Sequence, residues 1–229
     1  MSLIYLGTIA SSRPQPVITI PDAGSVGLIP DGYGTPLLWF SADSVVVDGS
    51  GNITTYINKG SGGTSMNATA NTTNYATVGD LNGKAVSLIP STSTGGYTIG
   101  GSGAGTMITG FATYKDGIDS LFDSYDGYMS GSLQMTGGQN SASWFSGQPA
   151  NPVKNGANNA VVLPCLNATI GAYLNSATPV TVTRLFQDDD STSRNWKGMS
   201  GDILVYNDQE YTEADMLAFH NQAVIFYGL

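Results

Sequence analysis

The segment from Gly198 to Leu229 limits what this chain can fold into more than any other part of it. Residues 203–206 are aliphatic, β-branched or aromatic, which favours a strand, and Asn207-Asp208 supplies a turn after them. Thr212 stands where a helix N-cap is expected, with acidic residues in the turn that follows. The apolar residues after it recur at roughly helical spacing: Met216, Leu217, Phe219, Ala223, Val224 and Phe226. The pattern predicts one strand and then one helix that packs on a sheet.

The rest of the sequence is typical of short strands joined by turns. It holds 30 Gly and 10 Pro among many Ser, Thr and Asn residues, which leaves little uninterrupted sequence for helices. Residues 106–114, 169–174 and 180–186 predict sandwich strands, and Trp39 and Phe40 predict a core strand with at least one ring buried under the terminal helix. We therefore expect an all-β protein, a two-sheet antiparallel sandwich with one C-terminal helix.

Two groups of residues carry a resemblance to a known family. Near the start, Leu37–Ser44 is followed by the Gly-rich stretch Asp48–Ile53, by Tyr56 and by an Asn-Gly hairpin at 81–88. Near the end, the strand and helix described above close the chain. In this order the motifs resemble the concanavalin A-like jelly roll of laminin-G-type and legume-lectin-type modules, with Tyr56 where a Trp is commoner. The resemblance implies one jelly-roll domain over residues 36–229.

The first 35 residues differ from the jelly-roll pattern. Three prolines surround an alternating β segment at 12–21, and such prolines favour an extended chain. Six apolar residues of this segment need burial somewhere: Ile4, Tyr5, Leu6, Val17, Ile18 and Ile20. A strand within the same jelly roll and an arm that docks on a neighbouring subunit both satisfy that need. We predict an extended assembly arm over residues 1–35.

The charge content narrows the class of protein. Charged residues make up 11% of the chain and the net charge is −9, against about 25% charged residues in an average protein. Ser, Thr, Asn and Gly must then cover the surface, as they do in virion shells, adhesins and secreted lectins. The acidic balance argues against nucleic-acid binding, and no stretch approaches the roughly 18 apolar residues of a membrane span. We expect a location on a virion surface or, alternatively, secretion to a cell surface.

Many proteins with a concanavalin A-like fold are glycoside hydrolases, so the carboxylates of this chain decide whether we expect an enzyme. Those enzymes use two carboxylates that face each other across the sugar. The chain has two Glu residues, Glu210 and Glu213, both at the entry to the terminal helix, where the helix dipole explains them. Asp119, Asp123 and Asp126 are spaced four and three residues apart and do not share a strand face. We predict that the protein is not an enzyme.

The remaining chemical signals are weak. Cys165 is the single cysteine and lies in an apolar run, so we interpret it as a buried hydrophobe. His220 is the single histidine, which we interpret as a packed or solvated helix residue, and one Cys with one His cannot build a zinc site. The Gly-rich run 100–105 lacks the P-loop lysine and a following helix, so we predict a flexible loop there.

Calcium is the one cofactor that the sequence leaves open. The densest carboxylate group is Asp188, Asp189 and Asp190, and Ca²⁺ takes six to eight oxygen ligands from such side chains and from loop carbonyls. A solvated turn explains the same triplet. These three residues are the candidate metal site, and no other cofactor is expected.

Two functions fit these features. The one we favour is a non-catalytic virion surface protein, a capsid decoration or tail component, that assembles with other virion proteins or with itself as a homo-oligomer. The alternative is a carbohydrate-binding module or adhesin that recognises a host surface polysaccharide. The candidate glycan-binding residues are aromatic residues in a Gly/Ser-rich context: Tyr125, Tyr128, Trp144 and Phe145. Each of them also fits a packing role in the core or in a hairpin.

Overall fold

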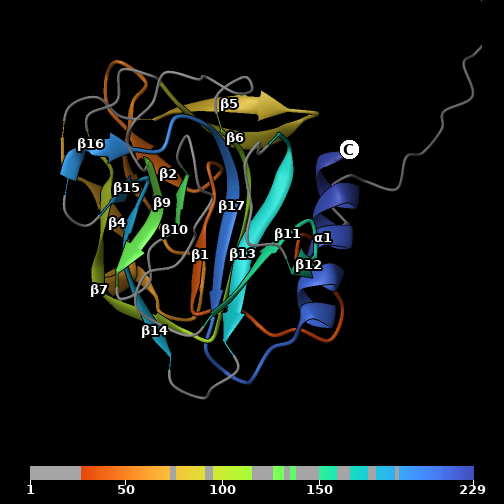
Figure 1. Ribbon diagram of the computed structural model, residues 1–229. Helices are drawn as coiled ribbons and strands as arrows, with labels where there is room; N and C mark the ends of the chain where they lie inside the picture. Colours follow the sequence, from red (N-terminus) through yellow and green to blue (C-terminus); the bar gives the residue numbers. More distant parts are fainter. Residues whose placement is uncertain are drawn as a thin grey trace, which may run out of the picture.

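The protein is a sandwich of two β-sheets with one helix on its outside (Figure 1). The computed structural model describes residues 27–72, 76–90, 95–114, 126–131, 135–137, 150–158, 166–174, 179–188 and 191–229. Among the strands that the structure describes, pairs are antiparallel apart from one parallel pairing between β16 and β9. The predicted all-β architecture with a C-terminal helix is confirmed. No helix in the described part of the chain is long and apolar enough to cross a membrane.

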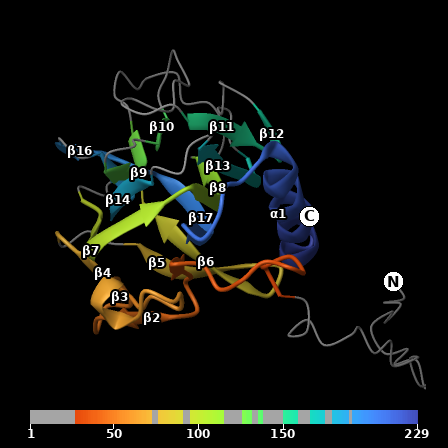
Figure 2. The same cartoon turned by 90° about the horizontal axis from the view of Figure 1, so that it is seen from below.

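The first sheet has eight strands in the described part of the chain and lies beneath the helix. Its strands, in spatial order, are β12 (Ala157–Asn158), β11 (Ala150–Lys154), β13 (Ala168–Leu174), β8 (Met107–Tyr114), β17 (Gly198–Tyr206), β6 (Lys84–Ile89) and β5 (Thr77–Leu81), with β1 (Leu38–Phe40) paired to β17. The strand predicted at 106–114 is β8, and the one at 169–174 is β13. Figure 2 shows helix α1 (Glu213–Tyr227) against the outer face of this sheet.

The second sheet, with nine strands among the described residues, packs on the other face of the first. Its strands, in spatial order, are β15 (Gln187–Asp188), β16 (Ser191–Asn195), β9 (Asp126–Gly131), β14 (Val180–Leu185), β7 (Tyr97–Gly105), β4 (Ala68–Ala70), β3 (Ile53–Tyr56) and β2 (Val45–Val47), with β10 (Met135–Gly137) paired to β9. A short 3-10 helix, Thr64–Met66, precedes β4. The strand predicted at 180–186 is β14.

The alternation of β17 divides the apolar residues between two cores. Ile203 and Val205 face the second sheet, whereas Leu204 and Tyr206 face α1. Because successive side chains of a strand point to opposite faces, one buried strand contributes to both layers. Residues 203–206 of β17 are therefore apolar on both sides, as is typical of strands covered on both faces.

β1 repeats this division with Trp39 and Phe40. The Phe40 ring is buried between the sheets, edge-to-face with Tyr56 at a centroid distance of 6.4 Å. Trp39 lies on the helix side but stays half-buried. The core strand is confirmed. The expectation that at least one ring is buried under the helix is wrong, because Trp39 on that side is only half-buried and the buried Phe40 ring points to the other sheet.

The helix begins as the sequence predicts. The Thr212 side chain accepts a hydrogen bond from the Asp215 amide, and the Asp215 carboxylate accepts one from the Thr212 amide, which forms a capping box. The buried residues of the helix are Met216, Phe219, Ala223 and Tyr227. Leu217 was expected on the packed stripe but is 46% exposed. A turn of 3.6 residues places it beside the stripe defined by the other four.

The glycine-rich run at 100–105 is a strand and not a loop, so that prediction is wrong. It forms the second half of β7, with a positive φ of 75° at Gly101. A Cβ on Gly103 would lie 2.4 Å from the Leu38 Cδ1 atom, and a Cβ on Gly105 would lie 2.4 Å from the Val205 Cγ1 atom. Glycine is needed there because side chains of the facing sheet fill the space.

Residues 27–35, the end of the predicted arm, lie on the helix within the same chain. Leu28 is buried in the core beneath α1, and the Gln222 side chain donates a hydrogen bond to the Gly27 carbonyl. The Tyr33 ring meets Phe219 edge-on at 4.7 Å. This part of the segment therefore packs with the sandwich. Residues 1–26, with all six apolar arm residues, lie outside the described residues.

Candidate functional site

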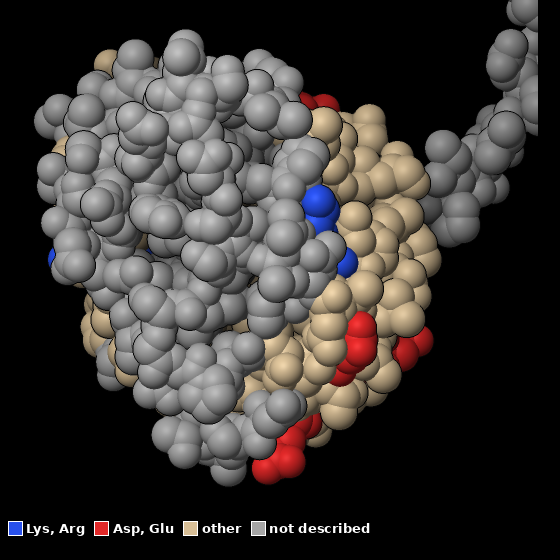
Figure 3. Space-filling view, in the orientation of Figure 1, with Lys and Arg blue, Asp and Glu red and all other residues tan. Residues whose placement is uncertain are grey.

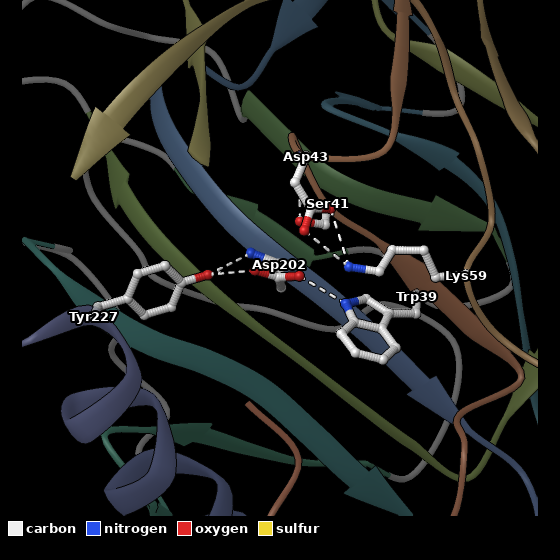
Figure 4. A network of polar contacts seen from close by, with 6 residues as sticks. All are labelled: Trp39, Ser41, Asp43, Lys59, Asp202 and Tyr227. Carbon is white, nitrogen blue, oxygen red and sulfur yellow. Dashed lines mark hydrogen bonds and ion pairs between the residues drawn. The ribbon is translucent and has the colours of Figure 1, made fainter. Parts of the chain in front are cut away.

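A group of polar contacts lies on the outer face of the first sheet, around a buried carboxylate (Figure 4). Asp202 sits in the middle of β17 and is 5% exposed. Gly201 precedes it, and a Cβ on that glycine would lie 2.2 Å from the Tyr227 hydroxyl. Glycine at this position therefore admits the last side chain of α1 to the strand.

Both oxygens of the Asp202 carboxylate accept hydrogen bonds. The Trp39 indole donates to Oδ1 at 2.6 Å, and the Tyr227 hydroxyl donates to Oδ2 at 2.7 Å. The same hydroxyl accepts from the Asp202 amide at 2.7 Å. Because one hydroxyl both donates to and accepts from one residue, its proton is directed at the carboxylate. The group ties β1, β17 and α1 together.

A cation lies on the solvent side of this group. The Lys59 ammonium is 4.2 Å from the centre of the Trp39 ring and 3.0 Å from Oδ1 of Asp43. Trp39 thus carries a cation on its ring and donates its indole N–H to an acid. The pair Lys59–Asp43 is partly exposed, so its ion pair adds little to stability.

Burial dominates the protonation of Asp202. Burial raises the pKa of this carboxyl group above its ordinary value, although hydrogen bonds from Trp39, Tyr227 and Ser41 and the charge of Lys59 act in the opposite direction. The carboxylate has no oxygen turned toward open solvent. Its chemistry is therefore that of a hydrogen-bond acceptor that fixes the helix to the sheet.

A small pocket adjoins this carboxylate between α1 and the sheet. Its cavity volume is about 10 Å³, far below the roughly 300–1,000 Å³ of sites that bind drug-sized ligands. The lining residues are Leu28, Thr109, Gly110, Phe111, Thr169, Asp202, Leu204, Phe219 and Ala223. At its edge, His220 Nδ1 lies 3.0 Å from the Thr169 hydroxyl, and burial lowers the pKa of this histidine. His220 is thus a packed helix residue that hydrogen-bonds to the sheet.

The C-terminal end of α1 is held at two further points. The Asn82 side-chain amide donates to the carbonyls of Tyr227, at 2.9 Å, and Gly228, at 3.2 Å. The Phe111 ring stacks on the Tyr227 ring with a centroid distance of 4.2 Å. Asn82 and Gly83 form the tip of the predicted hairpin, with φ values of 52° and 81°. A turn residue of the sheet thereby caps the helix.

Tyrosines and acids hold the other end of the helix. The Tyr33 hydroxyl donates to Asp215 at 2.6 Å, and the Tyr211 hydroxyl donates to Asp208 at 2.6 Å. Although burial raises the pKa of Asp215, the hydrogen bonds from Tyr33 and Thr212 outweigh it, and the net shift is downward. Burial, together with the hydrogen bond to Asp215, raises the pKa of Tyr33 to about 12. Asp208 and Asp215 therefore act as hydrogen-bond acceptors that hold the start of the helix in place.

The structure describes three of the five acids that were considered for catalysis. Glu213 accepts hydrogen bonds from the backbone and side chain of Asn158 on β12, so it contacts the sheet as well as the helix start. Glu210 is exposed in the turn before α1. Asp126 begins β9, whereas Asp119 and Asp123 lie outside the described residues.

The residues predicted for glycan and calcium binding fall largely where the structure gives no description. Tyr128 lies on β9 and Asp188 on β15, for which the backbone alone is described. Tyr125, Trp144, Phe145, Asp189 and Asp190 lie outside the described residues, as does Cys165. Among the residues that are described, no group of three or more His, Cys, Asp or Glu side chains is placed to hold a metal ion. These site predictions stay predictions.

Sequence reasoning missed the carboxylate at the centre of the network. Asp202 follows Gly201 inside a strand with no other charged residue, and that isolated acid was the available signal. A charged residue in a strand covered on both faces requires partners. Its partners come from residues 39 and 227, and nothing in their spacing along the chain indicates that they meet.

Comparisons with protein-family models, with curated proteins and with solved structures find no match.

Proposed function

We propose that this protein is a non-catalytic structural component of a virion surface, a capsid decoration or tail protein built on a lectin-like, concanavalin A-type jelly roll. The observation that carries the proposal is the use of its acids in the fold. Asp202, Asp208, Glu213 and Asp215 each accept hydrogen bonds that position strands or the helix. A glycosidase instead needs two carboxylates that face a sugar.

The surface supports the same proposal. On the face shown in Figure 3, the described surface is mostly free of Lys, Arg, Asp and Glu, in agreement with a chain of which 11% is charged. Long charged side chains lose rotamer freedom and hydration when an interface immobilises them. A surface with few of them suits close packing in an assembly.

Turnover assays test the non-catalytic part of the proposal. We expect no hydrolysis of β-glucans, galactans or chitin by the whole chain. Turnover that disappears in the Asp126→Asn variant would overturn the proposal, because it would assign a catalytic role to the acid at the start of β9. Asp80→Asn is a suitable control, since Asp80 is an exposed hairpin residue on β5.

A truncation tests the assembly part. Residues 1–26 should be removed and Gly27 kept, because Leu28 and Tyr33 pack on α1. We expect the truncated protein to fold and to lose attachment to the particle. A chain with Val17, Ile18 and Ile20 replaced by Ser should behave like the truncation, whereas Ser11→Ala with Ser12→Ala should attach normally. Normal attachment of the truncated protein would contradict the assembly arm.

The alternative function is recognition of a host surface glycan. One observation favours it, namely that Tyr128 lies on β9 inside the nine-stranded sheet and is therefore held by a regular strand. Stacking of a sugar on such a ring would make binding sensitive to Tyr128→Ala. A glycan array probed with the wild-type chain and with this variant measures the difference in glycan binding. Binding by the wild type alone would support this alternative, whereas no binding by either chain leaves the structural role.

A further inference from the structure

The tip of the β5–β6 hairpin is an Asn-Gly pair that lies beside the C-terminal end of α1 (Figures 1 and 2). Asn82 and Gly83 are both exposed. The Asn82 Nδ2 atom donates to the carbonyl oxygens of Tyr227, at 2.9 Å, and Gly228, at 3.2 Å. Because α1 has no basic residue in its last turn, this neutral amide takes the place of the cation that often binds the final carbonyls of a helix.

An Asn-Gly pair is also the dipeptide at which asparagine loses its side-chain amide most readily, because glycine has no side chain to shield its backbone nitrogen. In this reaction the Gly83 nitrogen attacks Cγ of Asn82 and forms a carbon–nitrogen bond. The bond from Cγ to Nδ2 breaks, and Nδ2 leaves as ammonia with the proton from the Gly83 nitrogen. Water then opens the cyclic imide at either carbonyl, which gives aspartate or isoaspartate. Water is the only reactant that the chain does not supply.

A second Asn-Gly pair, Asn155-Gly156, has nearly the same backbone shape but is packed differently. The φ angle is 52° at both asparagines, and it is 81° and 78° at the two glycines. Gly156 is buried, and a Cβ there would lie 2.7 Å from the Leu217 Cα atom, whereas a Cβ on Gly83 would have nothing within 4 Å. The Gly83 amide donates to the exposed Asp80 carboxylate at 3.1 Å, a bond that water can replace. The exposed turn therefore opens, and lets the nitrogen reach Cγ, at a lower cost in free energy.

We propose that Asn82 is a modification site, at which spontaneous deamidation releases the end of α1 from the first sheet. The reaction replaces an amide that donates by a carboxylate that can only accept. The new carboxylate faces two carbonyl oxygens, and its charge lies at the negative end of the helix dipole. Lys84 holds the same helix end through the Phe226 ring, 4.3 Å from its centre, so a shift of this ammonium toward the new carboxylate would remove a further contact.

The same reaction at Asn155 preserves the local contact. Asn155 uses its side-chain oxygen, because Oδ1 accepts a hydrogen bond from the Thr169 amide at 3.2 Å. A carboxylate at that position still accepts this bond. The two Asn-Gly pairs thus differ in the expected effect of deamidation as well as in its expected rate.

The expected release is confined to the last turn of the helix. The Tyr227 side chain keeps its hydrogen bonds to Asp202. The backbone bonds that Gly228 and Leu229 donate to the preceding turn lose the hairpin amide that supports them. This modification goes beyond the proposed assembly role and does not depend on it.

Ageing of the full wild-type chain at mildly alkaline pH tests the site. Trypsin releases Asn82 in residues 60–84 and Asn155 in residues 155–184, and tandem mass spectrometry locates each conversion of amide to acid. We expect conversion at Asn82 to be at least about threefold faster than at Asn155, because local opening of the exposed turn costs less. In denaturant the two rates should become similar. Equal rates in the folded chain, or faster conversion at Asn155, would overturn the inference.

Hydrogen exchange tests the effect on the helix. In the Asn82→Asp variant, the amides of Gly228 and Leu229 should exchange at least about threefold faster than in the wild type. Asn155→Asp is the matched control and should leave both rates unchanged. The aged wild-type chain should show a fast-exchanging population equal to its fraction deamidated at Asn82, a measurement that does not require the variant to fold. Unchanged exchange in the deamidated fraction, or equal acceleration in both variants, would overturn the inference.

Discussion

At the scale of the residue, the Tyr227 hydroxyl is the contact on which the position of the helix end depends. It meets both the backbone amide and the carboxylate of Asp202, at 2.7 Å each. Removal of a hydrogen-bond partner from a buried group costs more than the bond itself contributes, because the remaining group keeps its desolvation penalty.

Tyr227→Phe should therefore lower the free energy of unfolding by about 1–3 kcal/mol. Tyr33→Phe is the matched control, since its hydroxyl also donates to an acid but lies at a half-buried position. We expect a smaller loss there, about 0.5–1.5 kcal/mol. Chemical denaturation of the two variants measures both values. Equal losses would show that the Asp202 contact has no special weight.

The pH dependence of stability should contain a contribution from Asp202. Burial raises the pKa of this group above its ordinary value of 3.8, so the folded state holds the proton more tightly than the unfolded state does. The resulting stabilisation is complete below the ordinary pKa and is lost as pH rises through the raised pKa of the folded protein.

Asp202→Asn removes this titration. The stability of the wild type minus that of the variant should therefore be largest in acid and should fall toward neutral pH. Urea titrations of both chains from about pH 3 to about pH 8 test the sign. A difference that grows with pH would contradict a raised pKa at this carboxyl group.

At the scale of the element, strand β7 shows how composition misleads when the opposite layer is unknown. Its glycines are typical of a loop, yet they face the packed side chains of Leu38 and Val205. The hairpins and the helix N-cap were predictable because their determinants are local: φ values at Asn82 and Gly83, and the Thr212 side chain. Whether a strand position requires glycine depends instead on the side chains that face it from the opposite sheet.

Gly103→Ala should destabilise the protein by about 1–3 kcal/mol, because the new Cβ must displace a fully buried leucine. Gly49→Ala is the control, since a Cβ at that turn position has nothing within 4 Å. We expect that variant to stay within about 0.5 kcal/mol of the wild type. Thermal or chemical unfolding distinguishes the two, and similar stabilities would place residues 100–105 away from the facing sheet.

At the scale of the whole molecule, charge and association are linked. The chain carries −9, so copies that associate in the proposed assembly repel one another. Salt screens this general repulsion between copies.

Self-association should therefore strengthen as ionic strength rises from about 0.01 M to about 0.15 M. Sedimentation equilibrium of the wild-type chain at several salt concentrations measures this, with the chain that lacks residues 1–26 as the variant that should stay monomeric throughout. An oligomer that dissociates as salt is added would indicate ion pairs at the interface and would contradict assembly through the apolar residues of the arm.

The sequence alone determined features whose causes lie within a few residues. The capped helix after Thr212, the turn at Asn82-Gly83 and the alternation of residues 203–206 in β17 follow from local sterics, local hydrogen bonds and period-two patterning. The aromatic and acidic site predictions rested on composition, and these largely fall outside the described residues.

Only the tertiary structure decided which residues share a face or a network. Trp39, Asp202 and Tyr227 meet although 163 and 25 positions separate them along the chain. The sheet that covers one side of α1 decides which side of the helix is exposed. The leucine and valine of the facing sheet decide that β7 needs glycines. Packing between distant segments sets these features, and packing is not encoded in the spacing of neighbouring residues.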